Sequence, residues 1–271
     1  MSRFFLSLLM IAAAFGQTVQ PDSNKSVLSR DAIMVRLAAN QDRSQALRKE
    51  YICKEHIHIV THKPGGKLMR EETADYEIVP SGTGSQTQLK LLKGRYWHNG
   101  KYEDFNGEPI PDANSWDADY ISDVRRCLTQ DSRCTIATHL FPLTTAEQNK
   151  YDYRLIGQEV VRGRDAYRIA FVPKTENWLN WAGEAFIDTS DFQPIRVFTK
   201  LSRPVPFFVR SLGSNVSGFG YELDYKRQED GSWFPTSYGT EYELHLLFHI
   251  HRTVAVSMDT SFESGKPQSG H

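Results

Sequence analysis

The segment that decides the fold is GFGYELDYKR, residues 218–227. Its apolar and charged residues alternate, and the apolar ones are Phe219, Tyr221, Leu223 and Tyr225. A period of two is typical of an antiparallel strand that buries one face and exposes the other. The segment EYELHLLFHIH, residues 241–251, repeats the pattern. Two such strands side by side predict the apolar floor of a trough on one face of a sheet.

Short alternating segments separated by turn signals fill most of the chain. Turn signals include RGRD (162–165), DTSD (188–191) and EDGS (229–232). Strands are predicted at residues 51–61, 68–79, 86–93, 153–161, 166–173, 183–188, 194–201, 218–227, 233–238, 241–251 and 253–262. A loop or a short hairpin is predicted at residues 102–105. The chain is therefore predicted to be an α+β protein built on a curved antiparallel sheet.

Two segments have helical character. Residues 27–49 carry apolar Ile33, Leu37 and Leu47 near helical spacing, with Ser29 as the predicted N-cap. A short helix is predicted at residues 119–128. A helix that precedes a meander is expected to lie across the apolar, concave face of the sheet.

The first sixteen residues resemble a secretory signal peptide. Arg3 precedes an apolar run at residues 4–15, and small residues follow. A membrane anchor is the alternative, but twelve residues are fewer than the roughly 20 that a spanning helix needs. We therefore expect residues 1–16 to be removed on export to the periplasm. Residues 17–26 are expected to be a flexible leader, 27–262 a single domain and 263–271 a disordered tail.

Charge and cysteine content narrow the classes of function. The 271 residues carry a net charge of −1. The chain therefore lacks the positive electrostatic field that is typical of nucleic-acid-binding proteins. In an oxidising compartment, Cys127 and Cys134 are predicted to close a short loop as a disulfide, with free thiols as the alternative. Cys53 is expected to be a small buried side chain.

Histidines are the strongest enzyme-like signal. His56, His58 and His62 are separated by even numbers of residues, so in one strand they would point to the same side. The same holds for His245, His249 and His251. Neighbours at i and i+2 project to one side of a strand, so His249 and His251 are placed to share a metal. A solvent-facing polar row is the preferred interpretation, because there is no HExxH motif. No nucleophile elbow or phosphate-binding glycine motif is present either. The sequence thus predicts a protein that is not an enzyme, with no cofactor and no metal.

Four motifs carry a family resemblance. They are GQEVVRGRDAYRI (157–169), FID (186–188), PIRV (194–197) and DGSWFP (230–235). Over about the last hundred residues the chain resembles the LolA/LolB-like superfamily, in particular outer-membrane lipoprotein-sorting proteins. The resemblance implies an incomplete, or half, β-barrel around a helix-capped hydrophobic cavity that shields acyl chains or a lipidated partner.

The predicted function is that of a periplasmic carrier for a lipid or a lipidated protein, with transient membrane contact and an envelope protein as a further partner. Its predicted cavity residues are Ile195, Val197, Tyr221, Leu223, Tyr225, Leu244, Leu246 and Phe248. Two apolar insertions carry Trp178, Trp181, Phe207 and Phe208. Edge packing is the commonest role for such residues, and the alternatives are a lid over the cavity or a contact with the membrane or a partner. One alternative is an envelope sensor of the same fold. The other is a metal-dependent hydrolase in which His56 or His58 converges with His249 and His251.

Overall fold

The computed structural model describes residues 28–81, 84–108, 110–129, 143–175, 180–206, 210–211, 213–247 and 249–264. The strands are β1 (Tyr51–His62), β2 (Leu68–Ser81), β3 (Gly84–His98), β4 (Lys101–Asn106), β5 (Tyr151–Val161), β6 (Arg164–Pro173), β7 (Trp181–Asp188), β8 (Pro194–Leu201), β9 (Asn215–Ser217), β10 (Gly220–Arg227), β11 (Trp233–Leu246) and β12 (Ile250–Ser264). The helices are α1 (Arg30–Arg48), α2 (Trp116–Thr129) and α4 (Thr145–Gln148).

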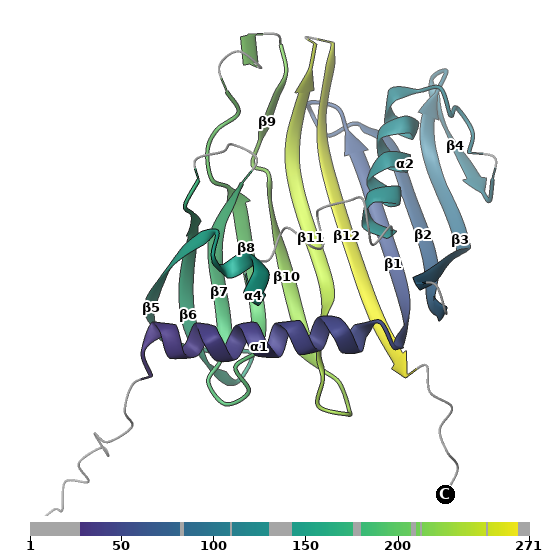
Figure 1. Ribbon diagram of the computed structural model, residues 1–271. Coiled ribbons are helices and arrows are strands. Elements are labelled where there is room, and N and C mark those ends of the chain that lie inside the picture. Colours follow the sequence, from purple (N-terminus) through teal and green to yellow (C-terminus); the bar gives the residue numbers. More distant parts are fainter. Residues whose placement is uncertain are drawn as a thin grey trace, which may run out of the picture.

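One antiparallel sheet of twelve strands forms the molecule. Its order is β4-β3-β2-β1-β12-β11-β10-β8-β7-β6-β5, and β9 pairs with β11. Strands β4 and β5 stand at the two ends of this order, so the sheet is open. Helices α1, α2 and α4 lie on one face of the curved sheet (Figure 1). The predicted fold class, a curved half-barrel with helices over its concave face, is confirmed.

Helix α1 crosses one end of the concave face (Figure 1). Its N-cap is Ser29, as predicted, and the Ser29 hydroxyl accepts a hydrogen bond from the Ala32 N–H at 3.3 Å. Its buried face contains Ile33, Met34, Leu37 and Ala38, and continues through the polar residues Gln41 and Ser44. The amide of Gln41 donates to that of Gln193 at 2.7 Å, which ties α1 to the turn between β7 and β8.

The register assigns each side chain to a face of the sheet. Leu223 of β10 pairs with Val197 on one side and Tyr238 on the other, and all three are buried. The residues on either side of Leu223 in β10, Glu222 and Asp224, point to the opposite, convex face. The concave face therefore holds the core, and the convex face is largely polar, as the alternation predicted.

One predicted strand is wrong. Residues 241–251 were expected to form a single strand, but β11 ends at Leu246 and β12 begins at Ile250. The chain reverses at Leu247, which takes a φ of 48°, and the His249 N–H donates to the Leu246 carbonyl at 3.1 Å. This turn contains no Gly, Pro, Asn or Asp, so nothing in the alternating pattern marks it. The predicted strands at 233–238 and 241–251 therefore become one long strand, β11, and the start of β12.

Candidate functional site

The concave face divides into two parts. The part beneath α1 is closed by large buried side chains, among them Ile187, Ile195 and Tyr225, which are at most 6% exposed. Asn40 of α1 donates to the Asp191 carbonyl at 2.9 Å, so α1 lies over the end of the sheet at which β7 turns into β8. This part is the core of the protein.

The other part of the concave face carries the aromatic floor, which we define as Trp181, Phe219, Tyr221 and Tyr242. Ring centroids lie 5.0 Å apart for Trp181 and Tyr221, 5.1 Å for Trp181 and Phe219, and 4.6 Å for Phe219 and Tyr242. Trp181 and Phe219 are half-buried, whereas Tyr221 and Tyr242 are buried. The floor therefore offers a continuous aromatic surface, drawn from β7, β10, β11 and the segment before β10.

Helix α2 lies in front of β1 and β2 (Figure 1), and its Tyr120 contacts Tyr242 of this floor. Trp116 and Tyr120 stack on each other at 4.7 Å, and both are half-buried. The Tyr120 hydroxyl hydrogen-bonds to the Tyr242 hydroxyl of the floor. We call Trp116 and Tyr120 the α2 wall.

Buried charges hold α2 against the sheet. Arg252 of β12 donates from Nε and Nη2 to the two carboxylate oxygens of Asp117, each at 2.8 Å. Near the other end of the helix, Arg125 donates to Glu72 of β2 at 2.8 Å. Glu72 also accepts from Arg70 at 2.6 Å. All five side chains are at most 10% exposed, so the pairs act in a medium that screens them little.

The tyrosines of this region are neutral at physiological pH. Burial raises the pKa of Tyr242, Tyr120 and Tyr221 above the ordinary value of tyrosine. The floor and the wall thus present uncharged rings with hydroxyl groups. Such a surface accepts apolar chains without burying a charge.

The structure brings six of the eight predicted cavity residues together as buried side chains of the concave face. They are Ile195, Val197, Tyr221, Leu223, Tyr225 and Leu244, each no more than 7% exposed. Leu246 is half-buried on the same face, and Phe248 lies outside the described residues. Of this set, Tyr221 belongs to the aromatic floor. Ile195 and Tyr225 belong to the core beneath α1.

Of the predicted lid residues, Trp181 lies in the floor itself. Trp178, Phe207 and Phe208 lie outside the described residues, as does Cys134. The disulfide between Cys127 and Cys134 therefore stays a prediction. Cys53 takes part in no disulfide. It is half-buried rather than fully buried as expected, and its Sγ lies 3.9 Å from the Tyr51 carbonyl oxygen.

The histidine rows do not converge. On the convex face, His56 contacts Asp75 at 2.6 Å and His58 contacts Glu71 at 2.8 Å. The register pairs His58 with Ser257, which is six residues, or roughly 20 Å along a strand, from His251. The alternative in which His249 and His251 share a metal also fails, because His249 lies in the turn and His251 faces His245 of β11. The hydrolase alternative loses the geometry that it required.

Exposed apolar side chains are scattered rather than gathered. Among the described residues, the large ones are Val35, Leu89, Tyr102, Ile156, Val160, Val172, Phe198 and Leu247. They come from α1, the turn after β11 and several strands, and single exposed apolar residues are normal. This distribution offers the sensor alternative no specific support. Within the described part of the chain, no helix has the length and apolar character to cross a bilayer.

Sequence reasoning did not find the α2 wall or the ion pairs beneath it. The helix itself was predicted at residues 119–128, but its packing face carries Asp117, Ile121 and Arg125 at four-residue spacing. Charged residues at such positions ordinarily indicate a solvated face. Their partners Glu72 and Arg252 come from distant strands, so no local signal identified them.

No protein-family model and no curated protein matches the chain. Among solved structures, it is similar to a DUF1329 family protein from Desulfovibrio piger, with 13% identity, a TM-score of 0.38 and coverage of 88% of this chain and 95% of the other. An outer membrane lipoprotein-sorting protein domain from Vibrio parahaemolyticus is 10% identical at a TM-score of 0.35, with coverage of 87% and 95%. A LolA superfamily protein from Nitrosomonas europaea is 12% identical at a TM-score of 0.32, with coverage of 86% and 92%.

Two of these structures, the lipoprotein-sorting protein domain and the LolA superfamily protein, are of the kind that the sequence motifs resemble. At such identities and TM-scores they bear on no ligand or partner. A function for this chain has to follow from its own geometry.

Proposed function

We propose that the chain is a periplasmic binding or carrier protein that shelters an acyl chain, of a lipid or of a lipidated protein, on its concave face. The observation that supports this is the aromatic floor with the α2 wall beside it. Apolar side chains that are only half-buried gather there, including Trp181, Phe219, Trp116 and Tyr120. The face beneath α1, in contrast, is filled by the chain's own core.

The chemistry of the floor suits an acyl chain. Each buried CH₂ group contributes about 0.8 kcal/mol, so even a partly sheltered chain of ten carbons gains several kcal/mol. The Tyr120 and Tyr242 hydroxyls hydrogen-bond to each other, which uses one of their two O–H donors and leaves the other for an ester or amide group at the end of the chain. A carrier must also release its guest, and the half-buried rings of Trp181 and Phe219 keep part of the floor exposed to solvent.

The periplasmic location is part of the proposal. It is supported by the leader at residues 1–16, in which Arg3 precedes a short apolar run. These residues lie outside those that the structure describes. Secretion of the full chain fused to a reporter that is active only outside the cytoplasm tests this part separately.

The binding part is tested with a fluorescent fatty acid and two matched variants of the untagged chain. Phe219→Ser removes a ring from the floor, whereas Phe198→Ser removes a ring from the convex face, where Phe198 is 37% exposed. Burying a Phe side chain is worth about 1.5–3 kcal/mol, so Phe219→Ser is expected to weaken binding by about 10- to 100-fold. Phe198→Ser is expected to leave binding unchanged.

Two results contradict the proposal. One is a wild-type chain that binds no fatty acid and yields no co-purified lipid in native mass spectrometry. The other is an equal loss of binding in both variants, which would place the guest elsewhere. Circular dichroism of both variants confirms that each is folded before binding is measured.

A further inference from the structure

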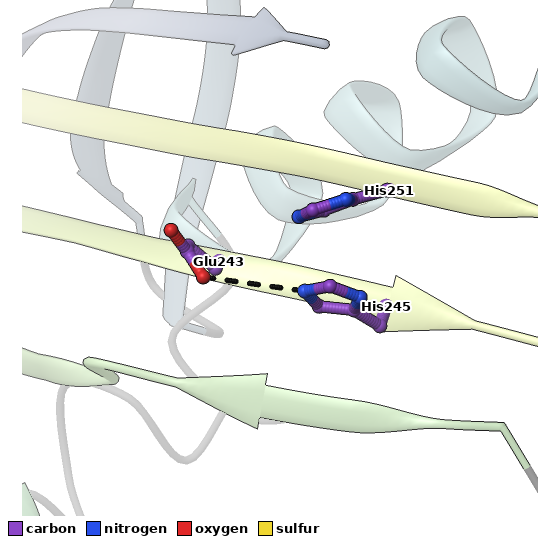
Figure 2. A group of neighbouring side chains, drawn as sticks. All are labelled: Glu243, His245 and His251. Carbon is purple, nitrogen blue, oxygen red and sulfur yellow. Dashed lines mark ion pairs between the residues drawn. The ribbon is translucent and has the colours of Figure 1, made fainter. Parts of the chain in front are cut away.

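A cluster of metal-binding side chains lies on the convex face, away from the aromatic floor. His245 of β11 and His251 of β12 are register partners next to the hairpin turn. Their ring centroids lie 3.6 Å apart with an interplanar angle of 34°. Glu243 precedes His245 by two residues and so lies on the same face, with 4.0 Å between its Oε2 and the His245 Nε2. Figure 2 shows the three side chains next to one another, two from one strand and one from its neighbour.

The contacts of this cluster differ from those of the other convex-face histidines. His56 and His58 each lie within 2.8 Å of one carboxylate, a normal hydrogen-bond distance. The imidazoles of His245 and His251 instead lie against each other, and neither forms a hydrogen bond with a side chain of another described residue. Two imidazoles and a carboxylate in this arrangement have nitrogen and oxygen lone pairs free for a cation.

The dimensions fit a small divalent metal. One ligand atom from each of Glu243, His245 and His251 lies within 4.8 Å of the others. In a tetrahedral zinc site with bonds of about 2.0–2.1 Å, the ligand atoms are about 3.4 Å apart. Small side-chain rotations therefore bring all three to bonding distance, and half-buried rings on paired strands lose little freedom in doing so.

The surroundings complete the site. The Ser217 hydroxyl donates to Glu243 Oε2 at 3.3 Å, and such partners orient carboxylate ligands. A pocket of about 500 Å³ opens beside the two histidines, and its other lining residues include Arg210, Ser211 and Asn215. This pocket leaves room for a fourth ligand, such as water or a small anion.

We propose that Glu243, His245 and His251 bind one divalent transition-metal ion of the zinc type, with an open fourth position toward the pocket. Imidazole nitrogens select Zn²⁺ and Cu²⁺ over Mg²⁺ and Ca²⁺, which prefer oxygen. The bound ion joins β11 to β12 beside their turn and, through Ser217, contacts β9. The site is independent of the acyl-chain site, because it lies on the opposite face of the sheet.

The test is calorimetric titration of the untagged, metal-free chain with ZnCl₂. The expected result is one ion per chain, with no competition from excess Mg²⁺. His251→Ala or His245→Ala is expected to weaken binding more than about 100-fold, because losing even an outer-shell partner costs 10- to 100-fold. Ser217→Ala, which removes such a partner, is expected to weaken it about tenfold. The double variant His56→Ala/His58→Ala is the control, and it should bind zinc as the wild type does.

Thermal unfolding provides a second measurement. Zinc is expected to raise the Tm of the wild type and of the control variant, and to leave that of His251→Ala unchanged. The proposal is overturned if the wild type binds no zinc. It is also overturned if His251→Ala binds it as tightly as the wild type, or if the control variant loses the binding. None of these results depends on whether the chain binds a fatty acid.

Discussion

The ion pair between Asp117 and Arg252 provides a quantitative test of how α2 is held. Asp117→Asn keeps the size of the side chain but removes its charge, which leaves the Arg252 guanidinium buried without a counter-charge. The two side chains are 9% and 10% exposed, and two hydrogen bonds of 2.8 Å join them. Breaking a buried pair by removing one partner costs about 3–5 kcal/mol. This is a large fraction of the roughly 5–15 kcal/mol by which a domain is stable.

The same helix offers a matched control. Arg126 and Asp123 form an ion pair at 2.6 Å, but their side chains are 60% and 64% exposed. Exposed pairs contribute about 0–1 kcal/mol, so Asp123→Asn is expected to cost less than about 1 kcal/mol. Helix, charge type and substitution are the same in the two variants, and only the burial differs.

The assay is urea unfolding followed by circular dichroism and by tryptophan fluorescence. Trp116 lies 5.7 Å from the Arg252 guanidinium, so its emission also reports on the local contact. The double variant Asp117→Leu/Arg252→Met should recover much of the stability lost in Asp117→Asn, since two apolar side chains leave no buried charge. If Asp117→Asn costs no more than Asp123→Asn, the pair does not hold α2 and the reasoning fails.

Three further substitutions test the packing and the charge pairs of the sheet and of α1. Leu37→Ala in α1 removes a side chain that is 0% exposed, so we expect the free energy of unfolding in urea to fall by about 2–5 kcal/mol. A fall of less than about 1 kcal/mol would contradict the packing of α1. A Cβ at Gly183 would lie 1.9 Å from the Phe198 carbonyl oxygen, and Gly183→Ala is therefore expected to cost at least about 1–3 kcal/mol; an unchanged Tm would show that β7 and β8 are not so close. Burial alone raises the pKa of Asp188, but hydrogen bonds from Arg164 and from two backbone N–H groups outweigh it and hold that pKa below its ordinary value. Asp188→Asn should thus destabilise the chain at neutral pH, and its difference from the wild type should shrink as the pH falls below about 5; a difference that is constant down to pH 3 would contradict the assignment.

Much of the fold could be predicted because its signals are local. Strand β10 was predicted from the alternation of Tyr221, Leu223 and Tyr225 with charged residues. Helix α1 was predicted from its N-cap and its helical spacing. Strand β4 (Lys101–Asn106) was left open between a loop and a hairpin, and it pairs with β3 as a hairpin. These elements follow from side-chain periods and turn residues within a few positions of each other.

The candidate site was predicted only in part. The apolar row of β10 and β11 was identified, but its division into a closed core and a more open aromatic floor was not. That division depends on where α1 ends and where α2 lies over the sheet. The position of α2 depends in turn on Glu72 and Arg252, which the sequence separates from their partners by 53 and 135 residues.

The amino-acid sequence by itself determined which segments extend, which coil and which face of each strand is apolar, because periodicity and turn chemistry act over a few residues. Tertiary structure alone decided that the chain reverses at Leu247 and so places His251 opposite His245 and not beside His249. It also decided that Asp117 is buried against Arg252. Both outcomes are set by strand register and by the docking of a helix on the sheet, and these depend on contacts between residues that are far apart in the chain.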